Sequence, residues 1–149
     1  MNVHIREAAS KDVPALSYLM SHLLGREVLE SDMHNRLQFV DSSRYDELYV
    51  YEMEDKVVGV LGFRIREQIE EVARYGEISV LAVDPECKRQ GIGRQLVAFA
   101  EQLALQHGCK GTWLVSGYKR EQEAYVFYEQ QGYQRTGTRF VKPLSASEG

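Results

Sequence analysis

The most informative part of this 149-residue chain is one stretch, Val80-Leu81-Ala82-Val83-Asp84-Pro85-Glu86-Cys87-Lys88-Arg89-Gln90-Gly91-Ile92-Gly93-Arg94-Gln95-Leu96. A short apolar strand runs into a basic, glycine-bearing turn, and the turn opens directly onto an amphipathic helix. The first N–H groups of a helix have no partner within it, so they form a ready site for an anion. Gly91 and Gly93 let the backbone approach a phosphate closely, and Lys88, Arg89 and Arg94 add positive charge. The stretch therefore predicts a site for a ligand that carries a diphosphate.

Two well-known phosphate-binding loops do not fit this stretch. The P-loop requires a Gly-Lys-Ser/Thr end that is absent, and the dinucleotide fingerprint requires a third glycine where Leu96 stands. The run Lys88–Gly93 instead resembles the pyrophosphate-arm motif Arg/Gln-x-x-Gly-x-Gly/Ala of the GNAT superfamily of N-acetyltransferases, with Lys in the first position. The preceding run Leu81–Pro85 is similar to that family's fourth strand and the exit from it.

A second motif lies about 35 residues further on, at Ala124-Tyr125-Val126-Phe127-Tyr128-Glu129-Gln130-Gln131-Gly132-Tyr133. It resembles the family's Ala-x-x-Phe-Tyr-x-x-x-Gly-Tyr/Phe segment. The resemblance implies that Tyr128 lies near the sulfur of the cofactor and protonates the departing thiolate. Without the motif, Tyr128 would be one more aromatic residue on the buried face of a helix. The family's asparagine before this tyrosine has no counterpart in residues 118–123.

Transfer of an acyl group to an amine needs a base for the amine proton and donors for the developing oxyanion. Our candidate base is Glu77, on the strand that leads to the cofactor loop. Strand alternation predicts that Glu77, Ser79, Leu81 and Val83 share one face. Family members often carry an acidic residue at the position matching Ser79, and Glu77 lies one pleat away. The alternative, to which we give equal weight, is that Glu77 is a solvent-facing strand residue without a catalytic role.

The resemblance implies an N-acetyltransferase that moves the acetyl group of acetyl-coenzyme A (acetyl-CoA) to the primary amine of a small molecule, by direct attack in a ternary complex. Short runs near Glu77 and Tyr128 are similar to aminoalkylphosphonate and aminoglycoside enzymes. Two alternatives stay open, a protein N-terminal or lysine acetyltransferase and a non-catalytic acyl-CoA sensor. The residues expected to hold the co-substrate are Leu81, Ala82, Val83, Lys88, Arg89, Gln90, Gly91, Ile92, Gly93 and Arg94.

Composition narrows the class of protein further. The hydrophobic fraction of 44% and charged fraction of 27% are those of an ordinary globular protein, and the net charge of −4 argues against nucleic acid as a partner. No apolar run is long enough to span a membrane, and the N-terminus lacks a signal-peptide pattern. Two isolated cysteines, Cys87 and Cys109, give neither a disulfide framework nor a metal-ligand spacing. We therefore expect a cytoplasmic protein without a metal; a homodimer stays possible, because dimers are common in this fold.

Hydrophobic periodicity and turn residues predict one domain over 1–149. The fold class is α/β, with a mixed, mostly antiparallel twisted sheet of about six to seven strands and helices on both faces. The expected strands are Val3–Arg6, Leu48–Met53, Val57–Ile65, Gly76–Val83, Thr112–Val115, Tyr133–Arg135 and Thr138–Val141. The expected helices begin at Ser10 or Asp12, at Ser31 or Asp32, at Gly93 and at Glu121, and residues 145–149 form a frayed tail.

Overall fold

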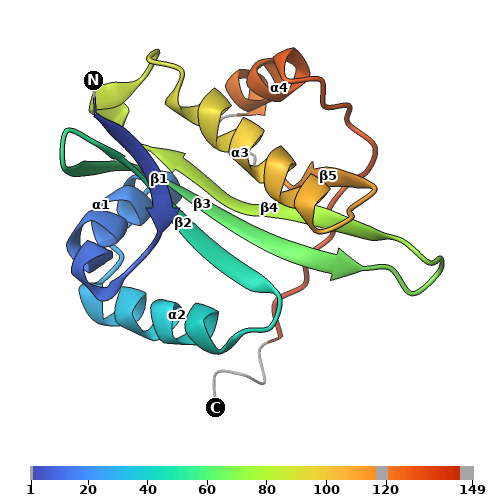
Figure 1. The fold of residues 1–149 in the computed structure, drawn as a ribbon, viewed down its shortest axis with the longest axis horizontal. Coiled ribbons are helices and arrows are strands. Elements are labelled where there is room, and N and C mark those ends of the chain that lie inside the picture. The colour runs from blue at the N-terminus through green and yellow to red at the C-terminus, as the bar shows by residue number, and fades with distance from the viewer. Residues whose placement is uncertain (1, 117–120, 145–149) are drawn as a thin grey trace. The chain divides into compact units, whose positions relative to one another are not determined.

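The computed structural model describes residues 2–116 and 121–144 (Figure 1). Contacts within the chain group into two compact units, Met1–Leu114 and Val115–Gly149. The first unit contains the sheet and the helices packed on it, and the second contains one helix and the chain that follows it. No helix of the described ranges is both long and apolar enough to cross a lipid bilayer.

The sheet of the first unit has five strands in the order β1-β2-β3-β4-β5. They are β1 (Val3–Glu7), β2 (Asp46–Met53), β3 (Lys56–Glu67), β4 (Arg74–Val83) and β5 (Gly111–Leu114). The first three pairings are antiparallel, and β4–β5 is parallel. Glu54 and Asp55 both have positive φ, 51° and 64°, as a type I′ turn requires, so β2 and β3 form a tight hairpin.

Helices cover both faces of this sheet, as predicted (Figure 1). On one face lie α1 (Val13–Leu24) and α2 (Glu30–Ser42), and on the other lies α3 (Ile92–Gln106). The core under α1 and α2 joins Leu16 and Leu37 to Val50, Val60 and Ala82 of the sheet. Helix α3 is amphipathic, as predicted, and its buried apolar face consists of Ile92, Leu96, Val97, Ala100, Leu103 and Ala104. This burial is the main stabilising term, at about 1.5–3 kcal/mol for each fully buried aliphatic side chain.

Helix α1 begins in an unexpected way. Asp12 occupies its N-cap position, but the carboxylate makes no capping bond to the helix. It instead accepts hydrogen bonds from both Nη atoms of Arg6, at 2.8 and 2.9 Å, and from the N–H of Ala9 at 2.8 Å. Arg6 also donates to Glu52 of β2. Asp12 therefore anchors the start of the helix to the first two strands.

The second unit contains α4 (Glu121–Gln130), which confirms the last predicted helix. Gly132 follows with a φ of 91°, where a left-handed residue ends the helix. The predicted strands Tyr133–Arg135 and Thr138–Val141 are wrong, because residues 133–144 are not in a strand. A strand needs a hydrogen-bonded neighbour, and side-chain propensity alone does not supply one. The described sheet therefore has five strands rather than six or seven, and the predicted tail, 145–149, lies outside the described residues.

Candidate active site

The segment that leaves β4 is shaped as an anion site. A short 3-10 helix (Pro85–Cys87) follows Asp84, and the chain then turns through Arg89, with φ 67°, and Gly91, with φ 77°. Gly91 is the N-cap of α3 and supplies no side-chain cap to it. The first helical hydrogen bond of α3 runs from the N–H of Gln95 to the carbonyl of Gly91, at 3.0 Å. The N–H groups of the first helical turn, from Ile92 to Arg94, thus point along the axis toward the loop.

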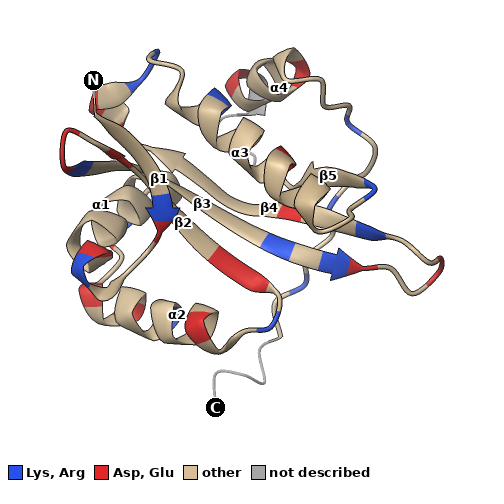
Figure 2. Cartoon of the chain, in the orientation of Figure 1, with Lys and Arg blue, Asp and Glu red and all other residues tan. Residues whose placement is uncertain are grey.

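Basic residues surround this helix start. Lys88, Arg89 and Arg94 are all exposed, and Figure 2 shows positive charge in the loop before α3 and in its first turn. No acidic residue lies in the first turn of α3. Backbone donors, a helix dipole and side-chain cations therefore gather at one place, as an anion site requires; that an anion binds here stays a prediction.

Strand β4 has an open edge next to this loop. The parallel pairing with β5 runs from Tyr75–Gly111 to Ile78–Leu114 and ends there. Within the described residues no strand pairs with the β5 side of Ser79–Val83. An extended ligand arm with amide groups can add to such an edge as an extra strand does. The predicted contacts Leu81, Ala82 and Val83 all lie on it.

Asp84 holds the end of this strand in place. It is 2% exposed, and its carboxylate accepts hydrogen bonds from the N–H of Glu86 at 3.0 Å and from the hydroxyl of Tyr18 at 3.2 Å. Its own N–H donates to the carbonyl of Val58 on β3, at 2.8 Å. Partial desolvation of the Tyr18 hydroxyl and the charge of Asp84 raise the pKa of Tyr18. Helix α1 is thereby tied to the start of the loop.

A β-bulge changes the faces predicted for β4. Gly62 of β3 pairs with Val80 and Phe63 pairs with Ile78, so Ser79 has no residue opposite it. The alternation of side chains is interrupted there, and the prediction that Glu77, Ser79, Leu81 and Val83 share one face is wrong. A Cβ on Gly76 would lie 3.2 Å from Ala104 of α3, so Glu77, the next residue, points to the opposite face.

Val83 and Leu81 point toward α3 instead. Val83 pairs with Gly59, where an added Cβ would meet Leu96 of α3 at 3.2 Å. Leu81 lies two residues from Val83 and shares its face. The bulge therefore changes which residues of β4 face α3: Leu81 and Val83 point toward that helix, whereas Glu77, before the bulge, points away from it.

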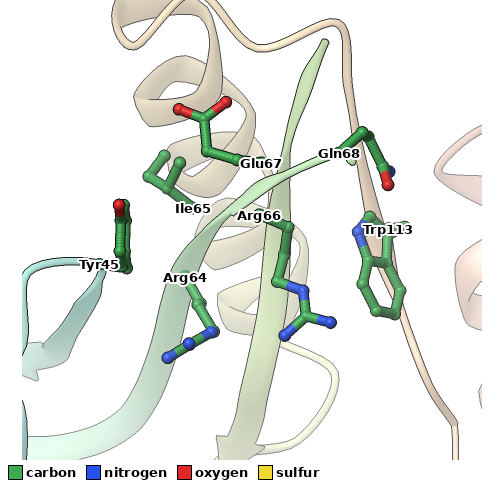
Figure 3. A pocket seen from close by; sticks show the side chains of 7 residues that line it. All are labelled: Tyr45, Arg64, Ile65, Arg66, Glu67, Gln68 and Trp113. Carbon is green, nitrogen blue, oxygen red and sulfur yellow. The ribbon is translucent and has the colours of Figure 1, made fainter. Parts of the chain in front are cut away.

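Glu77 lies in a row of polar and aromatic residues that crosses four strands. Asp46 pairs with Arg64, Arg64 with Glu77, and Glu77 with Trp113. The carboxylate of Asp46 forms an ion pair with Arg64, and Glu77 Oε1 lies 3.7 Å from Nε of Arg66. A hollow of about 280 Å³ opens along this end of β3. Figure 3 shows the side chains that line it: Tyr45, Arg64, Ile65, Arg66, Glu67, Gln68 and Trp113.

Tyr128, the candidate acid, belongs to the second unit. Its ring contacts Phe127 and Tyr133 edge-on, with centroids 5.0 and 6.1 Å apart. Burial raises the pKa of Tyr128 above its ordinary value of 10.0. The hydroxyl therefore keeps its proton throughout the neutral range, as a general acid must. Residues 118–120, the first half of the stretch in which the family's asparagine is missing, lie outside the described residues.

The sequence profile described as "Acetyltransferase (GNAT) family" matches residues 14–133. The chain belongs to the GNAT acetyltransferase family. An aminoalkylphosphonate N-acetyltransferase from Salmonella typhimurium is 29% identical to it over 153 residues, covering 94% of this chain and 90% of the relative.

Solved structures show the same fold. A GNAT family acetyltransferase from Staphylococcus aureus matches with a TM-score of 0.81 and 24% identity, over 97% of this chain and 100% of that chain. An aminoglycoside acetyltransferase from an uncultured soil metagenomic sample, crystallised with sisomicin, matches with a TM-score of 0.77 and 23% identity, over 95% and 96% of the two chains. Enzymes of the GNAT family use acetyl-CoA.

Three residues around the candidate site of this GNAT acetyltransferase were not predicted from its sequence. Arg66 and Trp113 flank Glu77, and Tyr18 supports Asp84. Arg64 and Arg66 are two residues apart on one strand, and this spacing predicts that both cations lie on the same face of the sheet. No local pattern shows that Trp113 lies beside Glu77, because that pairing joins strands separated by a whole helix. Among the described residues, no group of three or more His, Cys, Asp or Glu is arranged to hold a metal ion.

Proposed function

We propose that this chain transfers the acetyl group of acetyl-CoA to the primary amine of a small molecule, by direct attack in a ternary complex. The observation that carries the proposal is the open edge of β4 at Ser79–Val83, which leads into a basic loop and the uncapped start of α3. One continuous path thus offers strand-edge hydrogen bonds to an amide-bearing arm and N–H donors to a diphosphate.

Bound acetyl-CoA supplies an activated thioester. The N–H groups from Arg89 to Arg94 hold the diphosphate, and the backbone of Leu81–Val83 pairs with the pantetheine arm. A backbone N–H at the open edge of β4 donates to the oxyanion that develops on the attacked carbonyl. Glu77 accepts the proton of the amine, directly or through water. Tyr128 gives its proton to the leaving thiolate.

The name of the Salmonella relative makes aminoalkylphosphonates the first amines to test. Acetylation of a protein amine is the second candidate, but the hollow lined by Arg66 and Trp113 has a volume of about 280 Å³, which suits a small molecule better than an extended peptide. A sensor that binds acyl-CoA without turnover is the third.

The test is release of free thiol from acetyl-CoA, measured with a thiol-reactive dye, against aminoalkylphosphonates, aminoglycosides, polyamines, amino acids and short peptides. Thermal shift by acetyl-CoA alone is measured alongside. Turnover with a small amine supports the proposal. A thermal shift with no turnover favours the sensor, turnover restricted to peptides favours protein acetylation, and the absence of both signals overturns the assignment of the loop.

A further inference from the structure

The ion pair between Arg66 and Glu77 is looser than its neighbours. The two side chains approach only to 3.7 Å between Nε and Oε1, beyond ordinary hydrogen-bond distance, and the Arg66 side chain is 48% exposed. By contrast, Arg64 donates a direct hydrogen bond to the carboxylate of Asp46, and Nη2 of Arg74 lies 2.8 Å from Oε2 of Glu67. Arg66 and Glu77 thus present opposite charges side by side, with donors and acceptors left for a third molecule.

Trp113 gives this pair an apolar wall. The guanidinium carbon of Arg66 lies 5.7 Å from the centre of the Trp113 ring, within the range of a cation–π contact. Figure 3 shows the guanidinium of Arg66 between its own strand and the indole. The indole limits the positions open to the guanidinium, so Arg66 is partly ordered before a ligand arrives.

The pair also lies beside the place where transfer would occur. The β4–β5 pairing ends at Ile78–Leu114, one residue after Glu77–Trp113. At about 3.3 Å per strand residue, Glu77 is within roughly 7 Å of Ser79, the first residue of the open edge. A molecule held by Glu77 and Arg66 therefore sits next to the end of the edge that would carry the acyl arm.

We propose that Arg66 and Glu77 recognise a dipolar substrate, a small amine that bears an anionic group a few bonds from its nitrogen. Glu77 receives the ammonium group, and Arg66, placed against Trp113, receives the anion. A guanidinium fork matches the oxygens of a phosphonate, phosphate or carboxylate in two-point contact. This inference rests on the proposed acetyl transfer and names the substrate class of that same site.

Binding is tested through Trp113, which is the only tryptophan of the chain. Its fluorescence is titrated with 2-aminoethylphosphonate, with n-propylamine, which lacks the anion, and with 1,3-diaminopropane, which replaces the anion by a second cation. We expect a saturable change with the phosphonate at far lower concentration than with either control. Equal responses to all three amines, or no saturable response to the phosphonate, would overturn the inference.

Variants of Arg66 test whether this residue causes the preference for the anion-bearing amine. In Arg66→Gln, we expect the Kd for 2-aminoethylphosphonate to rise roughly 10- to 100-fold while that for n-propylamine stays within a factor of two or so, because one charged hydrogen-bond donor is lost. Arg66→Lys should restore part of the affinity. Arg36→Gln is the matched control, since it removes the same charge from an exposed arginine of α2 that hydrogen-bonds its neighbour Asn35 and lies 5.0 Å from the ring centre of Phe39. An Arg66→Gln variant that is folded and weakens both amines equally would also contradict the inference.

Thiol release separates this inference from the proposed function. Turnover with no preference for the anion-bearing amine overturns the substrate class and leaves acetyl transfer standing. A saturable, Arg66-dependent Trp113 response without thiol release supports the binding site and counts against the enzymatic proposal.

Discussion

Oε1 of Glu77 lies 3.7 Å from Nε of Arg66, across the β3–β4 pair and on the face of the sheet opposite α3. This relationship places the candidate base beside a cation and away from the residues of β4 that face α3. It exists because the bulge at Ser79 reverses the side-chain alternation between Glu77 and Leu81. One extra residue in a strand thus separates the proposed base from the strand segment proposed to hold the cofactor arm.

Removing the carboxylate of Glu77 tests its role as a base. In Glu77→Gln, we expect kcat at saturating amine to fall about 100- to 10,000-fold, the usual contribution of a positioned acid or base. The affinity for acetyl-CoA should be unchanged, because Glu77 lies outside the loop and the open edge. Thiol release gives kcat, and calorimetry gives the affinity for acetyl-CoA.

A matched control is Glu71→Gln, which removes an exposed carboxylate paired with Lys110 at 3.2 Å in the β3–β4 connection. It should retain wild-type kcat. A Glu77→Gln enzyme as active as Glu71→Gln would show that water carries the proton away without Glu77.

Tyr128→Phe tests the acid. We expect kcat to fall about 100-fold or more with little change in affinity for acetyl-CoA, because only the phenolic proton is lost. Burial raises the pKa of Tyr128 above 10.0. The protonated form is the active one, so wild-type kcat should hold through neutral pH and decline only as the pH climbs through that raised pKa.

The pH profile of kcat, with and without Tyr128→Phe, measures this effect. Phe127→Leu, which alters a neighbouring ring and no ionisable group, is the control for packing. If the kcat of Tyr128→Phe still declines at alkaline pH, the ionisation that causes the decline belongs to another group.

Gly91→Ala tests the loop between β4 and α3, which we propose binds the diphosphate of acetyl-CoA. Gly91 has a φ of 77°, and an added Cβ would lie 3.2 Å from Nη2 of Arg94. Two effects are expected: a loss of about 1–2 kcal/mol of stability from the left-handed backbone, and a several-fold rise in KM for acetyl-CoA from the displaced N–H groups. Thermal denaturation and steady-state kinetics measure the two.

Gly108→Ala separates the two effects. Gly108 has a φ of 70°, nearly the same strain, but an added Cβ would meet nothing within 4 Å. It should lower stability by a similar amount and leave KM for acetyl-CoA unchanged. If both variants raise that KM alike, the effect of Gly91 is one of stability alone.

The Arg6–Asp12–Glu52 cluster predicts acid sensitivity of folding. Burial alone would raise the pKa of Asp12, but hydrogen bonds from Arg6 and from the Ala9 N–H lower it below its ordinary 3.8. A carboxyl with a depressed folded-state pKa contributes stability above its unfolded pKa and loses it as the pH falls through the folded value. We expect the free energy of unfolding to drop below about pH 4.

Asp12→Asn removes this titration while keeping the shape of the side chain. It should cost about 1–3 kcal/mol at pH 7 and show a smaller further loss between pH 5 and 3 than the wild type, in urea titrations at each pH. An unchanged difference between wild type and variant across that range would rule out Asp12 as the source of the acid sensitivity.

Much of the fold was predictable because its signals are local. The β2–β3 hairpin depends on two adjacent residues, Glu54 and Asp55, and α3 on a regular apolar stripe. The two strands expected in 133–141 had suitable residues but lack a ladder partner among the described residues. Asp12 was correctly placed at the start of α1, but the pattern did not show that its carboxylate bonds Arg6 instead of the helix.

Membership of the GNAT family, and the glycine-bearing loop that we propose holds the diphosphate, could both be inferred from the spacing of residues adjacent in the chain, as from Leu81 to Gly93. The direction in which Glu77 points, and the residues around it, follow only from how distant strands pair. The bulge at Ser79 arises from the pairing of β3 with β4, and the contact of Arg66 with Trp113 joins strands separated by α3. Register between distant strands is set by the packing of both faces of the sheet, and no local window of residues contains that information.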